Sequence, residues 1–166
     1  MKSSKGLIDK INTLQFLVFD FDGVFTNNLV YVSESGEESV VCNRSDGLGI
    51  SKIKDLGLPM HVISTETNPV VGKRCEKLKI NCIQGCDNKL STLKNLVQNA
   101  GYEMEKVAYV GNDINDKQCL ESVGLPIVVK DAHPDVLHLA KYTTNNLGGH
   151  GAVREVCDLI FNVRGE

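Results

Sequence analysis

The feature that most constrains the fold is a regular alternation of short apolar runs with longer segments of helical periodicity. The apolar runs are rich in β-branched and aromatic residues and have the length of strands, at 15–20, 60–64, 80–84, 106–110 and 125–129. Apolar residues recur at helical spacing in the intervals 46–56, 69–78 and 88–100. Strands that alternate with helices predict a parallel sheet with helices on both faces, so we expect an α/β, Rossmann-like fold.

One segment interrupts this alternation. Residues 27–32 and 37–42 are short β-rich stretches that flank a loop containing Gly36, which predicts a β-hairpin insertion over residues 27–42. Because a two-stranded hairpin is marginally stable alone, we expect it to lie on its own domain or on another subunit. A surface hairpin without any partner is the alternative.

Bulk composition limits the function classes. The 166 residues, 42% of them hydrophobic, suit a single domain over 1–166, with a C-terminal tail and helix at 145–166. The net charge of -3 comes from dispersed acids and bases, which argues against nucleic acid as a partner. No apolar run has membrane-spanning length and no apolar export segment follows Met1, so we expect a cytoplasmic protein without membrane contact. The six cysteines lack the paired spacing of a zinc site or a disulfide framework.

Two carboxylates follow the first predicted strand. Asp20 and Asp22 come directly after the apolar run 16–19, and Gly23 allows the chain to turn there. The carboxyl end of a central parallel strand is where open α/β sheets place their chemistry. Two adjacent acids repel unless they share a cation, and an aspartate in this place can also attack phosphorus as a nucleophile. A solvated acidic turn is the plain alternative.

Further polar residues follow the other predicted strands. Ser64 offers a hydroxyl and backbone N–H groups to a phosphoryl oxygen. Lys89 begins a predicted helix, where a cation is unfavourable to the helix dipole unless an anion lies beside it. Asp113 and Asp116 supply hard oxygen ligands suited to Mg²⁺. Each has a plain explanation as a helix cap or a solvated charge, but parallel strands bring all of them to one edge of the sheet.

These residues resemble the four motifs of the haloacid dehalogenase (HAD) phosphatase superfamily, over nearly the whole chain. The motifs are Asp20-x-Asp22-Gly-Val, Ser64, Lys89 and Gly111-Asn-Asp113-x-x-Asp116. With a hairpin after the first motif and no room for a large cap domain, the chain is most similar to the small phosphatases of 3-deoxy-octulosonate 8-phosphate and of nonulosonate 9-phosphates. Two further stretches resemble the same subfamily, Arg44-x-Asp46-Gly-x-Gly-Ile and residues 148–155.

The resemblance assigns catalytic roles. Asp20 corresponds to the nucleophile that forms an aspartyl-phosphate, and Asp22 corresponds to the general acid and base. Ser64 and Lys89 correspond to the groups that bind the phosphoryl group. The resemblance also implies a homotetramer in which the hairpin and the tail contact neighbouring subunits. The glycines at 148–151 suggest a flexible or tightly turned segment within that tail.

Mg²⁺ is the cofactor that the resemblance implies. Its expected ligands are Asp20, the main-chain carbonyl of Asp22 and, from the fourth motif, Asp113. Many relatives carry an acid where Asn112 stands, and an amide oxygen coordinates with less charge. The sequence therefore leaves the last ligand open between Asn112 and Asp113.

The residues after Ser64 bear on the substrate. Octulosonate phosphatases commonly carry a Gly-Arg pair there, whereas this chain has Thr65-Glu66. The stretch Ser64-Thr65-Glu66-x-Asn68 resembles the nonulosonate branch. We therefore expect a nonulosonate 9-phosphate as the substrate, with octulosonate 8-phosphate as the alternative.

Five residues form the expected substrate site. Glu66 can accept hydrogen bonds from sugar hydroxyls but would repel a carboxylate. A sugar-acid carboxylate needs a cation, and the following helix offers two, from the same chain or across a subunit boundary. The expected set is Glu66, Asn68, Lys73, Arg74 and Asp46.

Two other function classes compete with a phosphatase. Phosphatase-like domains of this subfamily also occur fused to CMP-sialate synthetases, where they can support oligomerisation without catalysis, but the complete motif set argues against that. A phosphomutase would share the aspartyl nucleophile but usually needs a larger cap. Metal-dependent phosphate release separates the phosphatase from the assembly domain.

Overall fold

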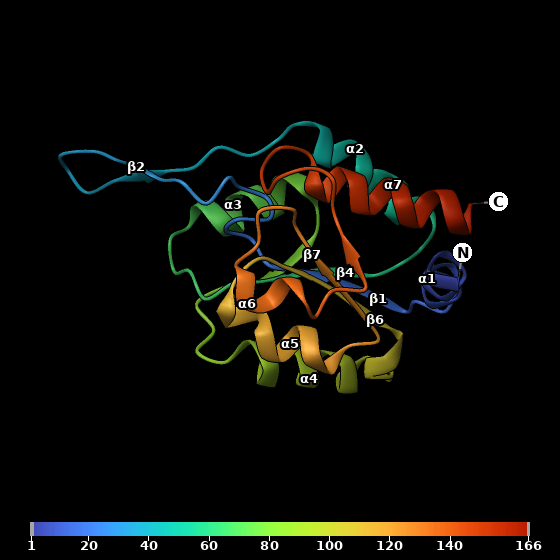
Figure 1. The fold of residues 1–166 in the computed structure, drawn as a ribbon. Coiled ribbons are helices and arrows are strands. Elements are labelled where there is room, and N and C mark those ends of the chain that lie inside the picture. Colours follow the sequence, from blue (N-terminus) through green and yellow to red (C-terminus); the bar gives the residue numbers. More distant parts are fainter. Residues whose placement is uncertain (1, 166) are drawn as a thin grey trace.

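A parallel sheet forms the centre of the structure, a computed structural model that describes residues 2–165 (Figure 1). The strands lie in the order β5-β4-β1-β6-β7-β8, and every neighbouring pair is parallel. This confirms the predicted fold class and the five predicted strands, while the two-residue β8 was too short to give a periodic signal. The strands are β1 (Phe16–Phe19), β4 (Met60–Ile63), β5 (Asn81–Ile83), β6 (Val107–Gly111), β7 (Leu125–Val128) and β8 (Tyr142–Thr143).

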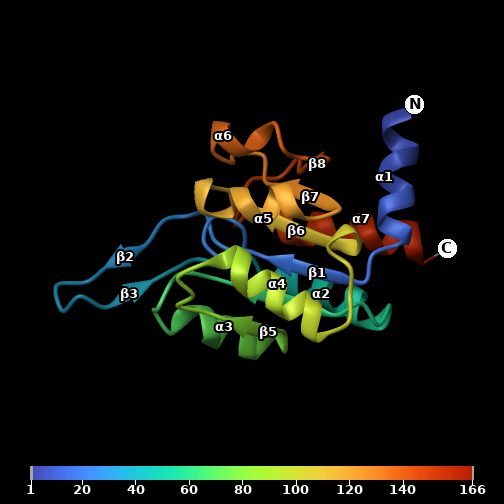
Figure 2. The same ribbon diagram turned by 90° about the horizontal axis from the view of Figure 1, so that it is seen from below.

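Helices cover both faces of this sheet. They are α1 (Lys2–Asn12), α2 (Ser45–Asp55), α3 (Val70–Leu78), α4 (Lys89–Asn99), α5 (Lys117–Ser122), α6 (Pro134–Leu137) and α7 (Ala152–Arg164). Helices α2 and α7 lie on one face, and α4 and α5 lie on the other (Figures 1 and 2). The positions of α2, α3, α4 and the C-terminal helix confirm the predicted helices. Within the described part of the chain, no helix is long and apolar enough to cross a membrane.

The order of the strands places a crevice at the end of β1. All four residues of β1 are buried, as expected for a central parallel strand covered on both faces. The chain runs from β1 outward to β4 and β5, and then crosses to β6 on the other side of β1. Ligand sites of open α/β sheets lie where the strand order reverses in this way. Asp20 follows β1 directly at that point.

The predicted hairpin insertion is present, with shorter strands than expected. Strands β2 (Tyr31–Val32) and β3 (Glu38–Ser39) pair antiparallel and form a sheet of their own, and Thr26 bridges Cys42 at the base. The hairpin projects away from the rest of the chain (Figure 1). Its large apolar side chains are therefore left exposed, at Leu29, Val30, Tyr31, Val32 and Val41. These apolar side chains are not covered by their own domain, and their contact with another subunit stays a prediction.

Candidate active site

A cavity of about 280 Å³ opens at the carboxyl end of β1. Residues that follow β1, β4 and β6 meet around it, although they are far apart in the sequence. The lining residues are Asp20, Asp22, Asn28, Ser64, Thr65, Asn112, Asp113, Ile114 and Asn115. The structure thus brings residues of the first, second and fourth motifs to one cavity, while Lys89 of the third lies buried behind Asp20.

The turn after β1 is held by hydrogen bonds around Gly23. Gly23 has a φ of 79°, in the left-handed region, and its N–H donates to Thr26 Oγ1 at 3.1 Å. The Phe25 N–H donates to the Phe21 carbonyl at 2.9 Å. A Cβ atom at Gly23 would clash with the side chain of Asn112, so glycine also lets the loop after β6 approach. This turn brings the carbonyl of Asp22 next to Asn112.

Lys89 lies between two buried carboxylates. Its Nζ is 2.6 Å from Asp20 Oδ1 and 2.8 Å from Asp116 Oδ1, and no side chain of the three is more than 6% exposed. Lys89 is the first residue of α4, and the Asn88 side chain caps this helix by accepting from the Ser91 N–H at 2.9 Å. These two carboxylates of the protein thus offset the unfavourable interaction between the Lys89 charge and the N-terminus of the helix dipole.

Burial controls the electrostatics of these groups. Burial and, to a smaller extent, the Asp116 carboxylate raise the pKa of Asp20 to about 8, against the opposing effect of Lys89. Burial also raises the pKa of Asp22, with a contribution from Glu66. Burial alone would lower the pKa of Lys89, but Asp20 and Asp116 outweigh it and the net shift is upward. A cation bound beside Asp20 would bring the pKa of this carboxylate down again.

Three oxygen atoms converge on one side of the cavity. The side-chain oxygen of Asn112 faces Asp20 Oδ2 at 3.0 Å and the Asp22 carbonyl oxygen at 2.9 Å. Without a cation these oxygens repel, and the Asn112 amide would turn so that its nitrogen donates to both. Ligands about 2.1 Å from an octahedral Mg²⁺ ion are about 3.0 Å from their neighbours. The two distances from Asn112 match both the hydrogen bonds of the turned amide and the separation of neighbouring Mg²⁺ ligands, so the amide oxygen can become a ligand when it turns back toward these atoms.

This oxygen set contains a single carboxylate. Across residues 2–165, no three His, Cys, Asp or Glu residues form a group that could hold a metal ion. The proposed ligands are instead one carboxylate, one main-chain carbonyl and one amide. Asp113 lines the cavity, but its Oδ1 accepts from the Ile114 N–H at 2.7 Å and caps the 3₁₀ turn η2 (Ile114–Asp116). Asn112, and not Asp113, therefore adjoins both Asp20 and the Asp22 carbonyl, and the choice of the fourth-motif ligand stays a proposal.

Ser64 and the turn after it form another wall. Ser64 Oγ accepts from the Glu66 N–H at 3.1 Å, which leaves the hydroxyl hydrogen to donate toward the cavity. Glu66 Oε1 accepts from the N–H groups of Thr67 and Asn68 at 2.7 and 2.8 Å. Asn68 Nδ2 donates to Glu38 of β3 at 3.4 Å. Glu66 thus holds the turn before α3, Asn68 joins this turn to strand β3 of the hairpin, and neither side chain lines the cavity.

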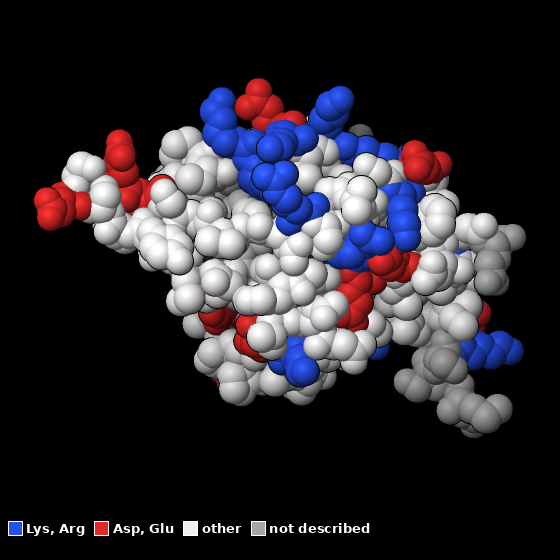
Figure 3. All heavy atoms as spheres, turned by 90° about the horizontal axis from the view of Figure 1, so that it is seen from above, with Lys and Arg blue, Asp and Glu red and all other residues white. Residues whose placement is uncertain are grey.

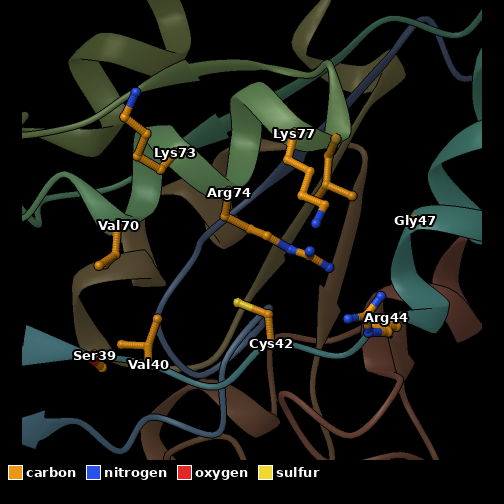
Figure 4. A pocket seen from close by; sticks show the side chains of 10 residues that line it. Ser39, Val40, Cys42, Arg44, Gly47, Val70, Lys73, Arg74 and Lys77 are labelled. Atoms are coloured by element: carbon orange, nitrogen blue, oxygen red, sulfur yellow. The ribbon is translucent and has the colours of Figure 1, made fainter.

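A second cavity, of about 750 Å³, lies between the base of the hairpin, α2 and α3 (Figure 4). Its lining carries four cations and no acid, and lysines and arginines gather on one face of the molecule in Figure 3. We call it the basic pocket. The residues that line it are Ser39, Val40, Cys42, Arg44, Gly47, Val70, Lys73, Arg74, Lys77 and Leu78.

Arg74 is the cation most deeply set in the basic pocket. Its Nη2 donates to the Asn43 carbonyl at 2.9 Å, while its buried Nε has no partner within residues 2–165. Lys77 points toward Arg74, whereas Lys73 points away from the pocket and pairs with Glu76 at 3.2 Å (Figure 4). The pocket therefore offers hydrogen-bond donors and positive charge to an anion.

Asp46 does not face either cavity. It is completely buried in the first turn of α2, and its Oδ1 accepts from the Arg154 N–H at the start of α7 at 3.1 Å. Its Oδ2 is buried without a partner in the described part of the chain. Burial raises the pKa of Asp46 to about 6, against the opposing effects of Arg154 and Arg74. The expectation that Asp46 contacts substrate is corrected, because its carboxylate is enclosed between α2 and α7.

The glycine-rich loop before α7 packs on the turn after β1, a contact that the sequence analysis missed. The Gly149 N–H donates to the Val24 carbonyl at 3.0 Å, and the Gly148 N–H donates to Asp131 Oδ1 at 2.9 Å. A Cβ atom at either glycine would clash with the backbone of the turn. The adjacent glycines were the available signal, because close backbone approach is one reason for glycine.

Comparisons with known proteins agree with this geometry. Residues 74–155 match the haloacid dehalogenase-like hydrolase family. The chain is 38% identical over 164 residues to the 3-deoxy-D-manno-octulosonate 8-phosphate phosphatase KdsC of Escherichia coli K12, covering 98% of this chain and 87% of that protein. The Yersinia pestis phosphatase of the same name has a TM-score of 0.92 at 35% identity, covering 96% of this chain and 87% of that one. The Moraxella catarrhalis phosphatase, solved with magnesium, phosphate and KDO, has a TM-score of 0.92 at 30% identity, covering 96% and 92%.

The fold and the strand-end aspartates with their buried lysine define a HAD-like hydrolase. More narrowly, the chain belongs to the 3-deoxy-D-manno-octulosonate 8-phosphate phosphatase family of phosphoric monoester hydrolases, of which the Moraxella catarrhalis member was solved with magnesium. This confirms the subfamily, the enzyme class and the cofactor expected from the sequence. These relatives are named for the octulosonate branch, so they support the alternative substrate over the nonulosonate that Glu66 favoured.

Proposed function

We propose that this protein hydrolyses a phosphorylated 2-keto-3-deoxy sugar acid, with 3-deoxy-octulosonate 8-phosphate as the first candidate. The observation that carries the proposal is the contact of Lys89 with Asp20 at 2.6 Å, beside the Asn112 side chain that adjoins both Asp20 and the Asp22 carbonyl. The substrate named for the relatives supports the choice of sugar acid.

Asp20 is the proposed nucleophile. Its carboxylate attacks phosphorus in line, so that a new P–O bond forms to Asp20 while the bond to the sugar oxygen breaks. Lys89 and the Ser64 hydroxyl offset the charge on the phosphoryl oxygens. Asp20, the Asp22 carbonyl and Asn112 would hold Mg²⁺, which when bound would supply positive charge that offsets the repulsion between the carboxylate and the phosphoryl group.

Asp22 is the proposed general acid and base. It lines the same cavity as Asp20, and burial raises its pKa, which favours the protonated form needed to donate to the leaving sugar oxygen. After the sugar leaves, the Asp22 carboxylate takes a proton from the water that attacks the aspartyl-phosphate. Phosphate is then released and Asp20 is restored.

The basic pocket is the proposed site for the sugar-acid carboxylate, in the same chain or across a subunit boundary. Arg74 provides a buried guanidinium nitrogen without a partner in the described residues, and Lys77 and Arg44 lie around it (Figure 4). Arginine suits a carboxylate because its fork of N–H groups can bind both oxygens. Lys73, which the sequence also suggested for this role, points away from the pocket and pairs with Glu76, so Arg74, Lys77 and Arg44 are the proposed cations (Figure 4).

A nonulosonate 9-phosphate is the second candidate because of Glu66. The carboxylate of Glu66 is near enough to raise the pKa of Asp22, and its Oε1 is held by the turn before α3. Its other oxygen can accept hydrogen bonds from the hydroxyls of a longer sugar. Asn68 keeps this turn in place through its contact with Glu38.

The test is phosphate release from octulosonate 8-phosphate, 2-keto-3-deoxynononate 9-phosphate and N-acetylneuraminate 9-phosphate, with Mg²⁺ or EDTA. We expect Mg²⁺-dependent turnover with a preference for the octulosonate. Asp20→Asn should lose at least about a thousandfold in rate because it removes the nucleophile. Asp87→Asn, an exposed residue after another strand, is the matched control and should keep the wild-type rate. A wild type that releases no phosphate from any substrate would favour the non-catalytic assembly domain.

A further inference from the structure

Asp116 connects two parts of the site. Its Oδ1 accepts from Lys89 Nζ at 2.8 Å, and its Oδ2 accepts from the Asn112 N–H at 2.9 Å and the Asp113 N–H at 3.3 Å. The side chain is completely buried. One carboxylate thus holds both the lysine that contacts Asp20 and the backbone of the proposed metal ligand Asn112.

Tyr109 reaches the same carboxylate from within the sheet. It lies in β6, is completely buried, and its hydroxyl donates to Asp116 Oδ1 at 2.7 Å. Burial raises the pKa of Tyr109 well above its ordinary value, so the hydroxyl keeps its proton and stays a donor. Lys89 and Tyr109 therefore share one acceptor oxygen of Asp116.

We propose that Tyr109 is a positioning residue for phosphoryl transfer, which acts through Asp116 by holding the oxygen that Lys89 shares. The inference rests on the proposed function, which assigns that step. A carboxylate oxygen with two donors attracts each less strongly than an oxygen with one. The Tyr109 hydroxyl thereby keeps Asp116 from drawing Lys89 away from Asp20 and from the phosphoryl oxygens.

Tyr109→Phe tests this role, because it removes the hydroxyl and keeps the buried ring. We expect kcat for the preferred sugar phosphate to fall about tenfold and KM to change less, since Lys89 acts on charge in the transition state. The Kd of orthovanadate, measured by calorimetry with Mg²⁺, should rise, because Lys89 would lie farther from the bound oxyanion. Tyr102→Phe is the matched control and should keep the wild-type values, since Tyr102 packs against Phe16 with ring centroids 5.8 Å apart.

A double-mutant cycle with Asp116→Asn separates positioning from packing. If Tyr109 acts through Asp116, Tyr109→Phe changes kcat little once Asp116 has become an amide. If the fold-losses in kcat of the two single variants multiply in the double variant, the proposal is overturned, because Tyr109 would then act independently of Asp116.

Two further outcomes are distinguishable. A wild type that turns over a sugar phosphate, with Tyr109→Phe equal to Tyr102→Phe in kcat and vanadate affinity, overturns the role of Tyr109 and leaves the proposed function intact. A wild type that neither releases phosphate nor binds vanadate overturns both.

Discussion

Asn112 gives the proposed Mg²⁺ site an amide oxygen where a carboxylate would add a second negative charge. Because the affinity for a hard cation rises with ligand charge, Asn112→Asp should lower the Kd of Mg²⁺ by about tenfold or more, at least about 1.4 kcal/mol. Without Mg²⁺ the same change places two carboxylates 3.0 Å apart, so Tm should fall and recover on addition of metal. Calorimetric Mg²⁺ titration and thermal unfolding measure both effects without reference to turnover.

Asn115→Asp is the control for this prediction. Asn115 lines the same cavity, and within the described residues no hydrogen bond joins it to Asp20 or Asp22, so Asn115→Asp adds the same charge outside the proposed ligand set. Its effect on the Kd of Mg²⁺ should be clearly smaller. If both variants lowered the Kd of Mg²⁺ equally, the carboxylate at position 112 would act by electrostatic attraction across the cavity, and not as a ligand.

Asp46 makes the stability of the protein depend on pH. Its pKa of about 6 in the folded state lies above the ordinary 3.8, so the folded protein binds the proton more tightly than the unfolded chain. The stability contributed by the protonated form is present near pH 4 and is lost as pH rises through 6, by up to about 3 kcal/mol. Urea unfolding of wild type and Asp46→Asn across this range should show curves that diverge. Parallel curves would contradict the burial of this carboxylate.

At the scale of elements, the turn after β1 is held from two sides. The loop after β6 contacts it through Asn112, and the glycine-rich loop before α7 contacts it through Gly148 and Gly149. A Cβ atom at Gly148 would clash with the Gly23 carbonyl, next to the carbonyl proposed to bind Mg²⁺. Two segments distant in sequence therefore determine where Asp22 lies.

Gly148→Ala should displace this turn. We expect a loss of about 1–3 kcal/mol in the free energy of unfolding, because backbone atoms must move, together with weaker Mg²⁺ binding. Urea unfolding and Mg²⁺ calorimetry measure these changes. Gly6→Ala, in α1 with open space around it, should leave both Mg²⁺ affinity and phosphate release unchanged. Unchanged Mg²⁺ affinity in Gly148→Ala would show that the turn does not depend on this loop.

At the scale of the whole molecule, the hairpin is the part that its own chain leaves uncovered. Tyr31 and Val32 are 69% and 63% exposed, and the hairpin extends beyond the sheet (Figure 2). An exposed apolar hairpin of this kind suits contact with another subunit. We therefore retain the proposal of a homotetramer in which hairpin and tail contact neighbouring subunits.

Serine at both Tyr31 and Val32 should reduce the molecular mass measured by light scattering and weaken substrate use, because the apolar contact between subunits is lost. Ile8→Ser, which removes an exposed apolar side chain from α1, is the control and should keep the wild-type mass. An unchanged mass in the double variant would contradict the role of the hairpin in assembly.

The sequence by itself determined the sheet and the edge on which the site lies. A central parallel strand is covered on both faces, so its residues form a continuous apolar run such as 16–19. This run can be recognised from neighbouring residues alone. Asp20, Ser64 and Lys89 were found because each follows a strand or begins a helix, and parallel strands end on the same side. The hairpin was predicted from its turn residues, although each of its strands has only two residues in the structure.

Only the tertiary structure decided which groups face one another. Asn112 and Asp113 are adjacent in sequence, and the turn around Gly23 is what directs Asn112 toward Asp20. Asp46 was excluded from the substrate site by a helix that begins more than a hundred residues later. Tyr109 lies in an apolar run and has the pattern of a core residue, and its polar partner becomes visible only when the chain folds back to Asp116. Such contacts depend on the packing of distant segments, which no local pattern contains.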